Sequence, residues 1–167
     1  MSRLQRIWRQ LRPAPPTTPP VAGLTAGALT LIEGPSGSGK TARAWRVATK
    51  AAAAGPVFFI DGDGDGPQAQ HDQLWYMAPI HAAQATDAAV AFCRMGRGGA
   101  IVLDSFSGLL PERFDAQRFC TRDLPRIIGA AYAGKVALLI THNPLLGPSP
   151  RELSTYAVTH RKLRRKP

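Results

Sequence analysis

A glycine-rich loop with one lysine and one hydroxyl residue offers the clearest chemistry in this chain of 167 residues. The loop matches the pattern G-x-x-x-x-G-K-[ST] and consists of Gly34, Pro35, Ser36, Gly37, Ser38, Gly39, Lys40 and Thr41. Glycines let backbone N–H groups surround a phosphate, the lysine can reach β- and γ-phosphates, and the threonine hydroxyl can bind Mg²⁺. The loop therefore predicts binding of a nucleoside triphosphate, with Lys40 also taking part in catalysis.

The segments on both sides of the loop fit this chemistry. Residues 28–32 are mostly apolar and predict a buried strand, whereas residues 42–54 are rich in alanine and predict a helix. The N-terminus of such a helix adds a partial positive charge beside a bound phosphate. The order of strand, loop and helix favours a phosphate site over a chance run of glycines.

A carboxylate at the end of a later strand completes a predicted Mg²⁺ site. The apolar residues 101–103 lead directly into Asp104, which would hold the metal through its water shell while Thr41 binds it directly. We therefore expect ATP and Mg²⁺ as the ligands. The next residue is Ser105, where AAA+ and ABC ATPases usually have a catalytic glutamate, and no Asn-Lys-x-Asp guanine motif follows the later strands.

Residues 21–167 are expected to form one α/β domain. Strand and helix patterns alternate along it, which predicts a mainly parallel sheet covered by helices on both faces. Further strands are expected at 57–60, 74–77, 100–103, 136–140 and 156–163, and further helices at 86–96 and 115–133. Pro125 is expected to break or restart the last helix.

Several stretches together resemble the ATPase core of the RecA-like superfamily, which includes recombinases, DnaB-type ring helicases and KaiC-type ATPases. Besides the glycine-rich loop, they are residues 23–30, Phe58–Asp63, Asp104–Ser105, Ile140–Asn143 and Tyr156–Arg165. The resemblance covers about residues 21–165. It implies a RecA-like P-loop fold with a doubly wound sheet and an active site formed between subunits of a ring or filament.

The resemblance also implies two further catalytic residues. Asp63 falls where the family usually has a glutamate that activates the attacking water, and Asn143 falls where a glutamine usually senses the γ-phosphate. Aspartate is one methylene shorter than glutamate, and Asp61 or a bridging water could compensate for this. His142, which precedes Asn143, is also unusual for the family.

Positive charge is concentrated at the two ends of the chain. The formal net charge is +10, yet residues 1–12 hold four arginines without an acid and residues 161–167 hold five bases without an acid. Such ends predict a polyanionic partner, most simply nucleic acid; an anionic membrane surface and plain solvation are the alternatives. One of the C-terminal bases could instead reach the γ-phosphate bound by a neighbouring subunit.

The first twenty residues predict a segment that mediates self-association. Apolar residues at i, i+3, i+4 and i+7 give residues 1–12 the pattern of a short amphipathic helix, and residues 13–20 form a stiff proline-rich spacer. A helix held away from its own core suits docking on another subunit. A disordered leader is the alternative.

Two other patterns bear on metal binding and on cellular location. Residues 61–66 match the opening of an EF-hand loop, with Asp72 at position twelve, but that position calls for glutamate and a helix should precede the loop. An acidic turn beside the γ-phosphate is the favoured interpretation, with Asp65 and Asp72 at its rim. Cys93 and Cys120 lack metal-ligand spacing, and no segment has the length of a membrane span, so we expect a cytoplasmic protein.

The expected function is ATP hydrolysis by an oligomeric RecA-like ATPase. Its leading form is a nucleic-acid-dependent motor or strand-binding ATPase that serves recombination, unwinding or packaging. The alternative is an ATP-dependent switch or scaffold that regulates a protein partner and hydrolyses little, which the departures at Asp63 and His142–Asn143 favour. A small-molecule kinase is disfavoured, because the sequence offers no evident lid or acceptor pocket.

Overall fold

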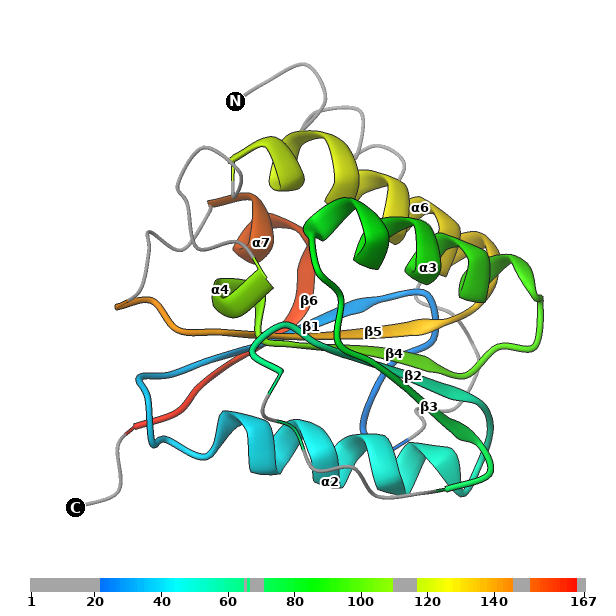
Figure 1. Ribbon diagram of the computed structural model, residues 1–167, viewed down its shortest axis with the longest axis horizontal. Helices are drawn as coiled ribbons and strands as arrows, with labels where there is room; N and C mark the ends of the chain where they lie inside the picture. Colours follow the sequence, from blue (N-terminus) through cyan, green and yellow to red (C-terminus); the bar gives the residue numbers. More distant parts are fainter. Residues whose placement is uncertain (1–21, 65, 67–70, 110–116, 146–150, 165–167) are drawn as a thin grey trace.

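The computed structural model describes residues 22–64, 66, 71–109, 117–145 and 151–164 (Figure 1). The predicted N-terminal helix at 1–12 and the spacer at 13–20 lie outside the described residues, as do Asp65 and the last three residues of the basic C-terminal segment. Self-association through residues 1–12 therefore stays a prediction.

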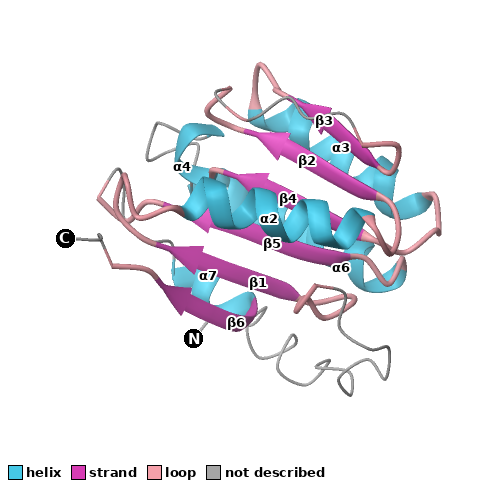
Figure 2. Ribbon diagram, turned by 90° about the horizontal axis from the view of Figure 1, so that it is seen from below, coloured by secondary structure: helices cyan, strands magenta, loops and turns pink. Residues whose placement is uncertain are grey.

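The described chain builds one sheet of six strands, all parallel to their neighbours. The strands are β1 Leu29–Glu33, β2 Val57–Asp61, β3 Leu74–Met77, β4 Ala100–Asp104, β5 Ala137–His142 and β6 Ala157–Lys162. Their order across the sheet is β3-β2-β4-β5-β1-β6 (Figure 2). Strand β5 thus separates β1, which leads into the glycine-rich loop, from β4, which ends in Asp104.

Helices cover both faces of the sheet, which confirms the predicted α/β architecture (Figure 1). Helix α2 (Lys40–Ala52) lies on one face. The opposite face carries α3 (Ala82–Arg94), α4 (Phe106–Leu109), the π-helical turn η1 (Phe119–Asp123), α6 (Leu124–Ala133) and α7 (Arg151–Tyr156). Pro125 stands in the first turn of α6, directly after the π-helical turn η1, so the chain stays helical on both sides of this proline and changes there from π to α.

Four elements differ from the predictions. Helix α3 begins four residues before the predicted start, because the ring Nδ1 of His81 caps it by accepting the N–H of Gln84 at 3.1 Å. Strand β5 runs to His142 because its last residues still pair with Ile32 and Glu33 of β1. The short helices α4 and α7 were not predicted, and α7 occupies part of the expected loop at 144–154.

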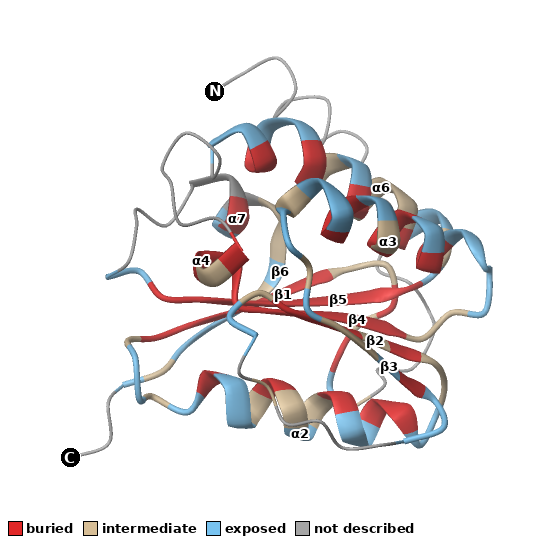
Figure 3. Cartoon of the chain, viewed as in Figure 1, coloured by how far each residue is buried: buried red, intermediate tan, exposed pale blue. Residues whose placement is uncertain are grey.

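The strands and the sheet-facing sides of the helices are buried (Figure 3), and apolar side chains on both faces of the sheet hold the strand ends in place. On one face, Phe59 and Leu139 pack with the small buried residues Ala44 and Ala48 of α2. On the other face, a larger cluster joins the sheet to α3, α4 and α6. Because close-packed interiors resist displacement, the loops that follow the strands start from fixed points.

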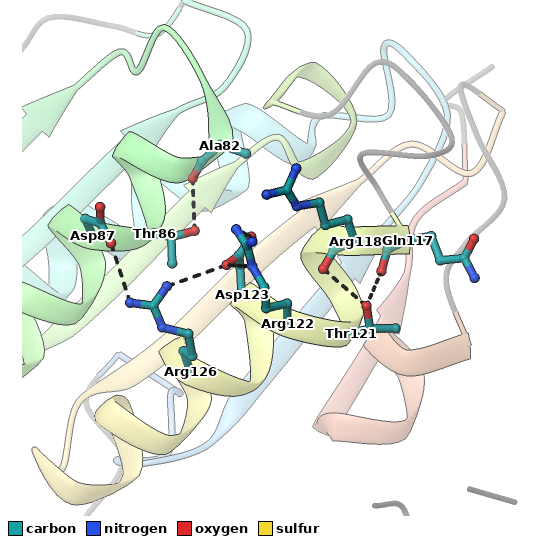
Figure 4. A network of polar contacts seen from close by, with 9 residues as sticks. All are labelled: Ala82, Thr86, Asp87, Gln117, Arg118, Thr121, Arg122, Asp123 and Arg126. Carbon is teal, nitrogen blue, oxygen red and sulfur yellow. Dashed lines mark hydrogen bonds and ion pairs between the residues drawn. The ribbon is translucent and has the colours of Figure 1, made fainter.

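A polar network joins α3 to α6 on the outer surface of the second layer (Figure 4). Arg126 reaches Asp87 of α3 and Asp123, each at 3.6 Å, and Arg122 donates to Asp123 at 3.0 Å. Both arginine side chains are half exposed, so the ion pairs themselves contribute little to stability. The network matters mainly because it covers the buried Asp123.

Gly99 before β4 offers a test of the packing at the start of the strands. It has φ +94°, and a Cβ there would overlap the carbonyl oxygen of Pro56, which also accepts the N–H of Ala100 at 3.0 Å. Gly96 has φ +67° but open space around it, so it is the matched control. We expect Gly96→Ala to lower the free energy of unfolding by about 1–2 kcal/mol. Gly99→Ala should lower the free energy of unfolding by about 1–3 kcal/mol more than Gly96→Ala does.

Urea unfolding of both variants measures this difference. An equal loss for the two would mean that the chain around Pro56 yields to the added methyl group without cost.

Candidate functional site

The predicted site residues come together at one edge of the sheet. In a parallel sheet the carboxyl ends of all strands lie on the same side, and the loops after them form the usual ligand crevice. The glycine-rich loop follows β1, Asp63 follows β2, Asp104 ends β4 and Asn143 follows β5. Four stretches that are distant in the sequence thus supply one cluster of polar side chains.

The glycine-rich loop turns directly into α2. Gly37 and Gly39 have φ of +76° and +83°, which side-chain-bearing residues rarely adopt, and a Cβ at Gly34 would lie 2.5 Å from Oγ of Ser38. Helix α2 begins at Lys40, with neither a side-chain cap on its N-terminus nor an acid in its first turn. This helix end therefore suits an anion, because its first N–H groups and its dipole favour negative charge.

Lys40 directs its ammonium group into the space shared by the carboxylates. The side chain is 9% exposed, and its Nζ donates a hydrogen bond to the carbonyl oxygen of Pro35 at 2.9 Å. Burial lowers the pKa of Lys40, while the nearby charges of Asp104 and Asp63 raise it. A lysine bonded to one loop carbonyl and near two carboxylates is well placed to exchange the Pro35 carbonyl for a phosphate oxygen.

Asp104 lies beside Thr41, as the metal-site prediction requires. Its buried carboxylate accepts hydrogen bonds from the hydroxyls of Thr141 and Thr41. Burial raises the pKa of Asp104; the two hydroxyls oppose this, and the charges of Asp63 and Asp61 add to it. A divalent cation next to Asp104 and Thr41 would offset the cost of burying this carboxylate.

Asp63 reaches back across the site to α4. The Ser105 hydroxyl donates to Oδ2 of Asp63 at 2.8 Å, and the N–H of Gly108 donates to the same Ser105 oxygen at 3.0 Å. A Cβ at Gly108 would overlap Oδ1 of Asp63, so the helix packs closely against the carboxylate. Asp63 is otherwise exposed and lies near enough to Lys40 to raise the pKa of that lysine.

Asp61 has a structural role in the acidic turn, and the expectation that it could compensate for Asp63 stays a prediction. Its carboxylate accepts the N–H groups of Asp63, Gly64 and Gly66 at 3.1, 2.9 and 2.6 Å, and the hydroxyl of Tyr76 at 2.5 Å. The side chain is buried beneath the turn. Backbone N–H groups of the acidic turn thus close around the Asp61 carboxylate. Of Asp61 and Asp63, only Asp63 faces the site.

Asn143 touches the glycine-rich loop directly. Its Nδ2 donates to the hydroxyl of Ser36 at 3.0 Å, and its Oδ1 accepts the N–H of Leu145 at 3.1 Å. The side chain is buried. The structure thus places the predicted sensor next to the predicted phosphate loop.

Several residues that support this cluster were not predicted. Ser105 and Ser107 stand on or beside α4, which is too short to be predicted, and Ser107 contacts both His142 and Asn143. Glu33, the residue before the glycine-rich loop, pairs with His160 of β6 at 2.6 Å. Their sequence separation leaves no local pattern that could have revealed these contacts.

The described part of the basic C-terminal segment lies beside the glycine-rich loop. Strand β6 is an edge strand that pairs with β1, and the N–H of Leu163 donates to the carbonyl oxygen of Glu33 at 2.7 Å. Arg161, Lys162 and Arg164 are exposed. Their positive charges therefore stand at the same edge of the sheet as the candidate site.

A groove of about 530 Å³ lies elsewhere, between the C-terminal half of α3 and the length of α6. It is lined mainly by small residues, together with Cys93, Arg94 and Arg126. Burial raises the pKa of Cys93 to about 11, so its thiol is a poor nucleophile. None of its lining residues belongs to the candidate site.

Among the residues that the structure describes, no helix is long and apolar enough to cross a membrane. No protein-family model matches the sequence, and a search of curated proteins finds no match.

Proposed function

We propose that this protein is a Mg²⁺-dependent ATPase with a RecA-like core. The observation that carries the proposal is the convergence of Lys40, Thr41, Asp104 and Asn143 on one glycine-rich loop at the carboxyl edge of a parallel sheet. These residue types are those that phosphate and Mg²⁺ binding need. The resemblance of residues 21–165 to RecA-like ATPases supports the same proposal.

Each part of the cluster has a role in binding. The loop N–H groups and Lys40 would hold the β- and γ-phosphates, and Thr41 with Asp104 would hold Mg²⁺. Bound Mg²⁺ would neutralise charge on the triphosphate oxygens. The partly buried Lys40 adds a second positive charge at the place where negative charge develops during phosphoryl transfer.

Hydrolysis would use Asp63 and Asn143. The oxygen of water forms a bond to the γ-phosphorus, the bond from that phosphorus to the bridging oxygen breaks, and ADP and phosphate leave. Asp63 would orient the water and accept its proton, either directly or through one further water because its side chain is short. Asn143 would donate from its amide to a γ-phosphate oxygen in place of Ser36.

Titration with a fluorescent ATP analogue, with Mg²⁺ and with EDTA, tests the proposal. We expect saturable binding that weakens without Mg²⁺, competition by ATP more than by GTP, and release of phosphate from ATP. Absence of Mg²⁺-dependent nucleotide binding would refute the proposed function.

Dependence on single-stranded nucleic acid is the leading form of this function. The exposed bases Arg161, Lys162 and Arg164 at the edge strand favour it, because they stand beside the loop that would bind ATP. A polyanion that lies along β6 would therefore reach the ATPase site.

Removing these three charges gives a direct prediction. We expect Arg161→Ala/Lys162→Ala/Arg164→Ala to weaken binding of single-stranded DNA or RNA. The slope of log affinity against log salt should fall by about 0.7 for each phosphate that the variant no longer neutralises. Filter binding at several salt concentrations measures both effects. The control, Arg94→Ala/Arg97→Ala/Lys135→Ala, removes three exposed charges at the opposite edge of the sheet. It should lower the affinity and the salt slope less than the first variant does. Equal effects would indicate attraction by net charge alone.

An ATP-dependent switch with little hydrolysis is the second candidate. The short Asp63 side chain, with one oxygen already bound by Ser105, favours it. ATPase assays with and without single-stranded nucleic acid separate the two functions. Strong stimulation supports the motor or strand-binding ATPase, and tight ATP binding with negligible turnover supports the switch.

A further inference from the structure

Helix α4 and the residue before it contact both residues that would catalyse hydrolysis, Asp63 at its carboxylate and Asn143 at its backbone. We infer that Ser105 and Ser107 are positioning residues through which α4 couples Asn143, the γ-phosphate sensor, to Asp63, the residue that activates water. The inference rests on the proposed ATPase function. It adds Ser107 and helix α4, which neither the motifs nor the resemblance indicate, and it gives Ser105 a role.

The Ser107 hydroxyl fixes the backbone at Asn143. It accepts the N–H of Asn143 at 2.9 Å, lies 3.0 Å from Nδ1 of His142, and faces the Asn143 carbonyl oxygen at 3.5 Å. Ser107 is buried, so water does not compete strongly for these contacts. Asn143 cannot move relative to α4 without breaking them.

The ring of His142 holds the Ser107 hydroxyl in this orientation. The ring packs edge-on against Phe106 at 5.5 Å between centroids, and burial lowers the pKa of His142, so the ring is neutral at physiological pH. With its hydrogen on Nδ1, it donates to Ser107, whose own hydrogen is then free to point at the Asn143 carbonyl. Within the described part of the chain, Nε2 of this ring has no hydrogen-bond partner.

The second arm of the coupling runs from α4 to Asp63. Ser105, one residue before α4, donates to the Asp63 carboxylate and is held by the N–H of Gly108 within the helix. Because α4 has only four residues, Ser105 and Ser107 cannot shift independently. When Asn143 leaves Ser36 for a γ-phosphate, the strain on its backbone would reach Ser107, then α4, and then Asp63.

The substitution Ser107→Ala tests the sensor arm without requiring turnover. Calorimetry gives Kd for ADP and for a slowly hydrolysed ATP analogue, each with Mg²⁺. Wild-type protein should prefer the triphosphate, and Ser107→Ala should reduce this preference about 5- to 10-fold, because the buried hydrogen bonds that hold the Asn143 backbone are removed. Affinity for ADP should stay unchanged, which also shows that the variant is folded.

The matched control is Thr86→Val on α3. Thr86 is buried and donates to the carbonyl oxygen of Ala82 at 2.9 Å, away from the site (Figure 4). Valine removes the hydroxyl and keeps the shape, so the preference for triphosphate should match that of the wild type. The inference would be overturned if Ser107→Ala kept the wild-type preference for triphosphate, or if the wild type had no such preference. In either case, binding of nucleotide by the wild type would still support the proposed function. No nucleotide binding by the wild type would overturn both.

The substitution Gly108→Ala tests the coupling itself. The added methyl group would displace Asp63 and disturb α4, yet it removes no hydrogen bond of Asn143. If α4 couples the two arms, this variant should lose triphosphate preference as well as turnover. A loss of turnover alone would overturn the coupling and leave α4 as a support for Asp63. Gly129→Ala on α6, where a Cβ meets open space, is the control.

Discussion

Replacement of Lys40 by alanine is expected to weaken binding of Mg²⁺–ATP by about 10- to 100-fold, because charge-assisted hydrogen bonds to phosphate are removed. Turnover should fall further, by about 100- to 1,000-fold, because the same ammonium faces charge that develops in the transition state. Affinity is measured with a fluorescent ATP analogue, and turnover by release of phosphate.

Lys50 supplies the control for this prediction. It is an exposed base in the last turn of the same helix, α2, and lies away from the site. Lys50→Ala should bind and hydrolyse ATP as the wild type does. If Lys40→Ala also behaved as the wild type, the glycine-rich loop would not be a phosphate site, and the contact of Lys40 with Pro35 would be only structural.

Asp104→Asn is expected to reduce affinity for Mg²⁺ about 10- to 100-fold, because Asp104 would hold the metal through its water shell. The same change should make the metal-free protein more stable at neutral pH. Burial raises the pKa of Asp104 above its usual value in the unfolded chain, so the folded protein binds this proton more tightly.

The sign of the pH dependence follows from that raised pKa. As pH rises through the carboxyl range, the wild-type protein must ionise a buried group, and its free energy of unfolding decreases. Asparagine stays neutral, so the advantage of the variant should be greatest at neutral pH and should shrink as the solution is acidified. Thermal melting in EDTA across this range measures the effect, and the same concentration of added Mg²⁺ should stabilise the wild type more than the variant.

Asp87→Asn is the control for this prediction, because Asp87 is exposed and lies on α3 away from the site. It should alter neither the Mg²⁺ dependence nor the pH dependence of melting. A melting temperature of Asp104→Asn below that of the wild type at neutral pH would mean that the hydrogen bonds from Thr41 and Thr141 outweigh the cost of burial.

Much of the fold was predictable because its signals are local. The apolar runs of β1, β2, β4 and β5 and the alanine-rich α2 can each be recognised within a few residues. Boundaries were less predictable where a contact outside the element decides them. Helix α3 begins earlier than propensity suggests because the His81 side chain caps it. Strand β5 extends to His142 because its last residues pair with β1.

The sequence by itself determined the glycine-rich loop, its place between a strand and a helix, and the strand that ends in Asp104, because each depends on residues that are adjacent in the chain. Only the tertiary structure decided which carboxylate faces the site. Asp61 and Asp63 stand two residues apart in one acidic turn, yet backbone N–H groups close over Asp61 while Ser105 holds Asp63.

Only the tertiary structure also decided the contacts that position the catalytic residues of the proposed site. Asp63 meets Ser105 across 42 residues, Asn143 meets Ser36 across 107, and His160 meets Glu33 across 127. No periodicity or motif encodes such pairs, because the strand order β3-β2-β4-β5-β1-β6 creates them. Local chemistry depends on neighbouring residues, whereas the positioning of that chemistry depends on which strand ends the folded sheet brings side by side.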